Sequence, residues 1–217
     1  MPGNRTTGLL ALGGIAVAAV LAVLAHLEVN DDLSPWSLTV SDFAVSDRGG
    51  VLDVAMVLLA AASAVLLPAL RRSGAHRAAG PLLGAWAAGL LTSAVVPTNP
   101  PGLPMDTAAY VHRYASVVAF LALPLAGWLL AGGVGGRTAG WLRALTLASL
   151  VLAGAMIWSA YPGDRVLLGL VERLLILAEV GLLTVVAVRL LRPASAHSNS
   201  CSMSWRAASV MEPERLG

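Results

Sequence analysis

Residues 166–191 read VLLGLVERLLILAEVGLLTVVAVRLL and decide the fold. The stretch is apolar apart from four charged residues, Glu172, Arg173, Glu179 and Arg189. A helix of about 20 residues that rises about 1.5 Å per residue crosses the roughly 30 Å hydrocarbon core of a bilayer. The stretch therefore predicts a transmembrane helix that carries charges within the membrane.

Five further stretches of the chain have the same length and apolar character. They are residues 8–27, 51–70, 78–96, 108–131 and 140–161. Hydrophobic residues make up 57% of the sequence and charged residues only 12%, a balance that a water-exposed surface does not tolerate. We therefore predict an all-α fold: a polytopic membrane helical bundle of about six transmembrane helices over residues 8–191, after a short segment 1–7.

The arginines predict the orientation of this bundle. In a six-span arrangement most of them fall on one side, and the positive-inside rule makes that side cytoplasmic. Aspartates dominate the opposite loops. The sequence thus predicts cytoplasmic N and C termini and a multi-pass protein of the plasma membrane. The arginines on the cytoplasmic side are Arg5, Arg71, Arg72, Arg77, Arg137, Arg143, Arg189, Arg192, Arg206 and Arg215.

Two segments lie outside the predicted spans. Residues 192–217 are polar and Ser-rich, which predicts a disordered cytoplasmic tail. Residues 28–50 form the longest external loop, in which Ser37 to Val40 and Phe43 to Val45 alternate like short strands, so we expect a small hairpin there.

Charged residues inside the spans are expected to have a structural or functional role, because inserting one at the centre of a membrane helix costs about 2.5–3.5 kcal/mol. Glu172 and Glu179 are seven residues apart and share a helix face, which puts Glu179 about 10 Å deeper in the membrane. The others are expected to meet Glu172 in one cluster that faces outward. The cluster is Asp53, His112, Arg113, Glu172 and Arg173.

Two interpretations of this cluster remain open. It is either a network of interhelical salt bridges or a functional site. As a site, its catalytic candidates are Glu172, Glu179 and His112. Its ligand-binding candidates are Asp42, Asp53, His112, Arg113, Glu172 and Arg173.

The sequence carries no motif for several other classes of function. The net charge of +2 and the lack of a basic stripe argue against nucleic-acid binding. Cys201 is the only cysteine, and His26 and His112 lie on separate helices without ligand spacing, so we predict no metal site. Phosphate-binding and nucleophile motifs do not occur, and no cofactor is expected.

Four short stretches, in this order, resemble the membrane family catalogued as domain of unknown function 998, found in actinobacteria and archaea. They are residues 41–44 (SDFA), 96–101 (VPTNPP), His112 at the opening of the fourth span, and 169–174 (GLVERL). The resemblance implies the same six-helix topology without implying a reaction. Asn99 stands where an aspartate is expected in the family, so a role that needs charge at that position is in doubt.

The leading hypothesis is a membrane protein that binds or senses a lipid or small amphiphile at an outward-facing polar pocket. Besides the lipid bilayer and this ligand, a second copy of the chain is a further partner to consider. One alternative is a membrane-embedded enzyme that acts on a lipid or isoprenoid by acid catalysis at Glu172 or Glu179. Another is a small proton-coupled transporter. The sequence does not decide whether the protein is an enzyme.

Overall fold

A computed structural model describes residues 2–28, 34–45, 50–100 and 103–191. Within these ranges the regular structure is helical throughout, which confirms the all-α prediction. The helices are α1 (Pro2–Glu28), α2 (Val40–Ala44), α3 (Gly50–Arg72), α4 (Ala79–Val95), α5 (Thr107–Gly132), α6 (Gly136–Ala160) and α7 (Leu168–Leu191).

The six predicted spans correspond to six of these helices. Five of the helices, α1, α3, α5, α6 and α7, are long and apolar enough to cross a membrane. The third span forms the shorter apolar helix α4, whose 17 residues reach roughly 26 Å at 1.5 Å per residue. The prediction of a polytopic helical bundle is thereby confirmed.

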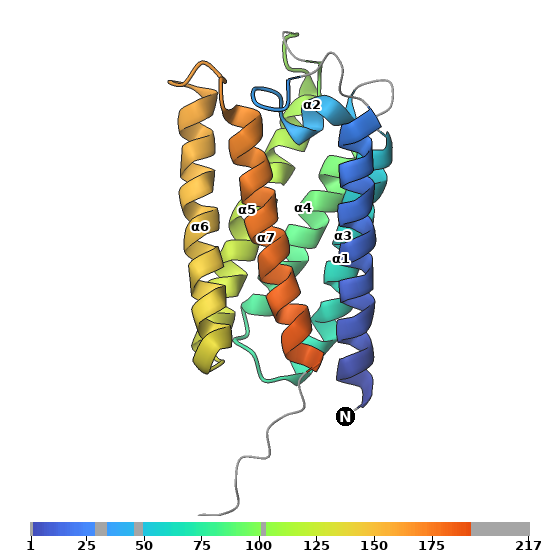
Figure 1. The fold of residues 1–217 in the computed structure, drawn as a ribbon, viewed down its shortest axis with the longest axis vertical. Helices are drawn as coiled ribbons and strands as arrows, with labels where there is room; N and C mark the ends of the chain where they lie inside the picture. The colour runs from blue at the N-terminus through green and yellow to red at the C-terminus, as the bar shows by residue number, and fades with distance from the viewer. Residues whose placement is uncertain (1, 29–33, 46–49, 101–102, 192–217) are drawn as a thin grey trace, which may run out of the picture.

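The five long helices and α4 form a ring in which each helix packs against its neighbours in the chain, and α1 closes the ring against α7 (Figure 1). Successive helices run in opposite directions, so the first turn of α1 and the last turns of α3 and α7 lie at one end. That end carries Arg5, Arg71, Arg72 and Arg189. We call it the arginine end.

Helices α1 and α7 pack tightly only near the arginine end. A Cβ atom added to Gly8 would lie 2.8 Å from the backbone oxygen of Ala187, so the two backbones nearly touch there. Buried apolar residues of all six ring helices, such as Ile15, Leu66 and Leu183, fill this half of the ring. Toward the other end α1 and α7 move apart, and α2 lies across the opening (Figure 1).

The hairpin predicted within residues 28–50 is wrong for the described part of that loop. Residues 40–44 form α2 instead. The physical reason is a capping box, in which the Thr39 hydroxyl accepts from the Asp42 amide and the Asp42 carboxylate accepts from the Thr39 amide. Phe43 then points inward, fully buried against Ala25 and Leu52. The predicted disorder of residues 192–217 lies outside the described residues.

Candidate functional site: a roofed cavity between α1 and α7

Residues 34–45, which we call the roof segment, are held to the start of α7 by backbone groups. The carbonyl oxygen of Trp36 accepts hydrogen bonds from the amides of Gly169 (2.9 Å) and Leu170 (3.2 Å). These amides belong to the first turn of α7, where no partner within the helix exists. A Cβ atom on Gly169 would lie 2.1 Å from the oxygen of Leu38 and 2.6 Å from that of Pro35, so only glycine allows this approach.

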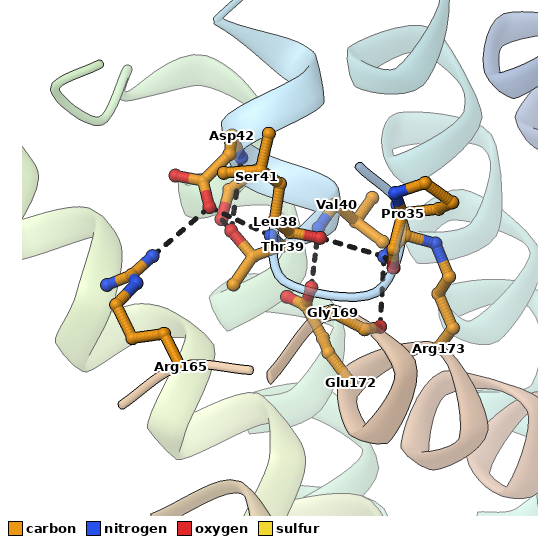
Figure 2. Close-up of polar contacts among 10 residues, drawn as sticks. All are labelled: Pro35, Leu38, Thr39, Val40, Ser41, Asp42, Arg165, Gly169, Glu172 and Arg173. Carbon is orange, nitrogen blue, oxygen red and sulfur yellow. Dashed lines mark hydrogen bonds and ion pairs between the residues drawn. The ribbon is translucent and has the colours of Figure 1, made fainter. Parts of the chain in front are cut away.

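Arg173 of α7 binds the roof segment from below. Its Nη1 donates to the carbonyl oxygens of Pro35, Leu38 and Gly169, each at 2.9 Å (Figure 2). Its Nη2 donates to Nε2 of His26 on α1 at 3.0 Å. The guanidinium also lies over the Phe43 ring, 4.9 Å from its centroid. One side chain thus joins α7 to α1 and to the roof segment.

Glu172 binds the same segment through a different group. Its carboxylate accepts a hydrogen bond from the backbone amide of Val40, the first residue of α2 (Figure 2). At the outer edge, Arg165 forms an ion pair with Asp42 at 3.3 Å. That pair is the one salt bridge among the described residues. The hypothesis of a salt-bridge network is therefore wrong here, since Glu172 and Arg173 are satisfied mainly by backbone groups of the roof segment.

Beneath the roof segment lies a cavity of about 420 Å³. Its wall on α1 and α3 is apolar except for His26. The wall on α4, α5 and α7 adds polar groups to apolar ones. The apolar wall includes Ile15, Ala18, Ala22, Leu52, Ala55, Met56 and Leu59, and the polar groups opposite belong to Trp86, Ser93, His112, Ser116, Glu172, Arg173 and Glu179.

The cavity opens sideways, between α1 and α7. Three of its lining residues, Val23 and Leu27 on α1 and Leu177 on α7, are also more than half exposed on the outer surface of the ring. Their side chains are apolar, and in a membrane this surface faces the acyl chains. A molecule dissolved in the bilayer thus reaches the cavity without passing through water.

Glu179 is the deepest charged group of the cavity. It is 3% exposed, and its Oε2 accepts a hydrogen bond from the indole nitrogen of Trp86 at 3.2 Å. Its Oε1 is buried and has no hydrogen-bond partner among the described residues. A buried polar atom left without a partner costs about 1–3 kcal/mol. Glu179 is thus placed for an interaction that the protein itself does not supply.

A second polar group lies closer to the roof segment. His112 is buried, and its Nδ1 donates to the carbonyl oxygen of Val96 at 2.8 Å, which leaves Nε2 as an acceptor in the neutral ring. Below it, the hydroxyl of Ser116 lies 2.9 Å from that of Ser93 and 3.0 Å from the His112 oxygen. All three residues line the cavity.

The structure brings only part of the predicted cluster together. His112, Glu172, Arg173 and Glu179 line the cavity. Asp42 lies in the roof segment, and Asp53 is within electrostatic range of His112. Arg113 is exposed on α5 and is not among the residues that line the cavity. The single cluster that the sequence predicted is therefore not formed.

Sequence analysis missed Trp86, Ser93, Ser116 and the backbone of the roof segment. A tryptophan in the middle of an apolar span was a usable signal, because its indole N–H needs an acceptor inside the membrane. The contacts made by the backbone of the roof segment could not be predicted, because no side-chain type indicates which carbonyl or amide group will bind a distant residue. Among the described residues no three metal-ligating side chains come together.

A ring of apolar helices around a roofed interior cavity defines a polytopic membrane protein. Residues 11–189 match the family described as "Protein of unknown function (DUF998)", and the chain belongs to this family. The match runs from within α1 to near the end of α7 and includes the roof segment. No curated protein and no solved structure matches the chain.

Proposed function

We propose that this protein binds a single-chain lipid or small amphiphile in the cavity between α1 and α7. The observation that carries the proposal is the sideways opening of an apolar cavity through Val23, Leu27 and Leu177. In the orientation predicted from the arginines, the cavity lies in the outer half of the plasma membrane. The ligand then comes from the outer leaflet.

The size of the cavity supports a single chain. Small-molecule sites typically have volumes of about 300–1,000 Å³, and the volume here lies near the lower end of this range. A phospholipid with two acyl chains needs more room. An apolar wall on α1 and α3 suits a chain, while polar groups on the facing wall suit a head group.

Transport through the ring gains no support from this geometry. Between Glu179 and the arginine end the described core is mostly apolar and includes Leu182, Leu183 and Val186 on α7 with Leu66 and Leu123. The buried hydroxyl of Thr146 beside Leu182 is taken up by the backbone oxygen of Pro124. A proton-coupled transporter needs polar groups or a cavity along its pathway. The cavity instead has the form of a binding site that is closed at its inner end.

Photolabelling in lipid nanodiscs tests the proposal. The probes are hexadecanol, its methyl ether and hexadecanoate, each carrying a diazirine at mid-chain. We expect labelled peptides from α1, α3 and α7, and competition by the unlabelled compounds. Labelling spread evenly over the outer surface for all three probes would overturn the proposal.

A matched pair of variants ties the labelling to the cavity. Ala55→Trp fills the cavity from α3, whereas Ala61→Trp puts the same side chain on the exposed surface of that helix. Labelling is expected to fall at least fivefold in the first variant and to persist in the second. Equal labelling in the two would place the probes outside the cavity.

Acid catalysis on an isoprenoid is a second candidate, favoured by one observation: a carboxyl group with an unpartnered oxygen stands beside an apolar cavity. Incubation of the protein with farnesol, followed by mass spectrometry of the extracted lipids, tests it. A product that depends on Glu179 would support the enzyme. Farnesol recovered unchanged would leave binding as the function.

A further inference from the structure

The head group of the ligand can be inferred from the hydrogen-bonding state of Glu179. The Oε2 atom is taken by Trp86, whereas Oε1 accepts nothing from the described residues. The carboxyl group lies at the inner end of the cavity, remote from the roof segment. A ligand that donates a hydrogen bond there would satisfy the one buried acceptor that the protein leaves open.

The ionisable groups of the cavity disfavour an anionic head group beside Glu179. Two carboxyl groups line it, those of Glu172 and Glu179. The one guanidinium in its lining, that of Arg173, is bound through Nη1 and Nη2 to three carbonyl oxygens and to His26, and only its Nε is left without a partner among the described residues. A fatty acid or phosphate beside Glu179 would therefore meet another acidic group and no cation at that depth, since Arg173 lies six residues nearer the roof segment on α7.

A hydroxyl fits the open acceptor better than an ammonium group does. An ammonium carries three N–H donors and a full charge, and both must be compensated inside the membrane. A hydroxyl donates one hydrogen, which matches the single unpartnered oxygen. It also remains neutral when it leaves the bilayer for the cavity.

We propose that the ligand is a long-chain alcohol that enters head first, with its hydroxyl donating to Oε1 of Glu179 and its chain lying toward Val23 and Leu177. This inference rests on the proposed function and adds the chemical class of the ligand. The chain then lies against the apolar wall of α1 and α3. Trp86 fixes the carboxyl group from the other side through Oε2.

The test compares two probes in which a methyl group replaces the hydroxyl hydrogen. Diazirine-bearing hexadecanol and its methyl ether have the same chain and the same oxygen, but the ether cannot donate. One additional hydrogen bond to a buried carboxyl group is expected to give the alcohol about tenfold tighter binding. Affinity is read from photolabelling of the α7 peptide against probe concentration, in nanodiscs.

The isosteric variant Glu179→Gln makes the test specific. With its amide oxygen on Trp86, the glutamine presents an N–H₂ donor to the cavity, which binds the oxygen of an ether as well as that of an alcohol. The tenfold preference is expected to fall to about one, with the cavity still labelled. A preference that survives in Glu179→Gln would overturn the assignment to Glu179.

The outcomes separate this inference from the proposed function. Equal binding of alcohol and ether to the natural sequence, with loss in Ala55→Trp, would overturn the alcohol and keep the amphiphile site. Tighter binding of hexadecanoate than of hexadecanol would do the same. No cavity labelling by any probe would overturn the proposed function itself.

Discussion

Two acidic residues of α7, seven positions apart, have opposite environments. Glu172, at the top of the cavity, binds the amide of Val40 and helps to hold the roof segment in place. Glu179, at the inner end, has one indole partner and one oxygen without any. Both are buried and both line the cavity. Two acidic residues on one helix face thus differ in role: Glu172 holds the roof segment, whereas Glu179 leaves an oxygen open, to which we propose the ligand binds.

The largest effect is expected from Arg173→Leu, which removes the central contact of the upper region. Three hydrogen bonds to carbonyl oxygens, the contact with His26 and the stacking on Phe43 disappear together. We expect a loss of about 3 kcal/mol in unfolding free energy, because hydrogen bonds to charged groups contribute about 1.5–3 kcal/mol each. Unfolding in mixed micelles measures it. The exposed Arg113 provides the control, since Arg113→Leu should change stability by less than about 0.5 kcal/mol.

Gly169→Ala should push the roof segment away from α7 without removing any polar group. The new Cβ atom would lie 2.1 Å from the Leu38 oxygen, and overpacking of this kind costs about 1–3 kcal/mol. We expect faster hydrogen exchange at the backbone amides of residues 34–45. Gly154→Ala on α6, where nothing lies within 4 Å, is the matched control and should leave that exchange unchanged. Equal exchange in the two variants would mean that the close approach at Gly169 does not hold the segment.

The two glutamates themselves give the sharpest form of the comparison. Glu172→Gln keeps an acceptor for the Val40 amide but loses the charge, so about 1 kcal/mol of stability should be lost. Glu179→Gln keeps the acceptor for Trp86 and replaces an unpartnered oxygen, so stability should change by less than about 0.5 kcal/mol. Thermal unfolding in dodecylmaltoside measures both. A larger loss at position 179 than at 172 would reverse the roles assigned to them.

The smallest effect is expected from Arg165→Gln at the edge of the roof segment. Its partner Asp42 is nearly buried, but Arg165 is 45% exposed, and ion pairs of this kind contribute about 0.2–1 kcal/mol. Asp42→Ala should cost about 1 kcal/mol more, because the capping box of α2 is lost as well. Raising the salt concentration should shrink the first effect and leave the second mostly intact.

Much of the candidate site was within reach of sequence reasoning. Glu172, Arg173, Glu179 and His112 were identified because charged and titratable groups are expensive in apolar spans, and the spacing of seven put both glutamates on one face of α7. Arg113 obeyed the same rule and yet lies on the exposed side of α5. Its neighbour His112 faces inward, and rotation about a helix axis is fixed by packing rather than by the presence of a charge.

The sequence by itself determined the bundle and its helices, because insertion of a span into a bilayer depends on its length and apolar character, which are local properties. It also identified the charged residues within the spans that are expected to have a structural or functional role. Only the tertiary structure decided that α1 and α7 separate away from the arginine end, that a capped helix rather than a hairpin covers the opening, and that Arg173 binds backbone carbonyls instead of Glu172. These outcomes depend on contacts between residues as far apart in the chain as His26, Val40 and Arg173, whose distances no local pattern encodes.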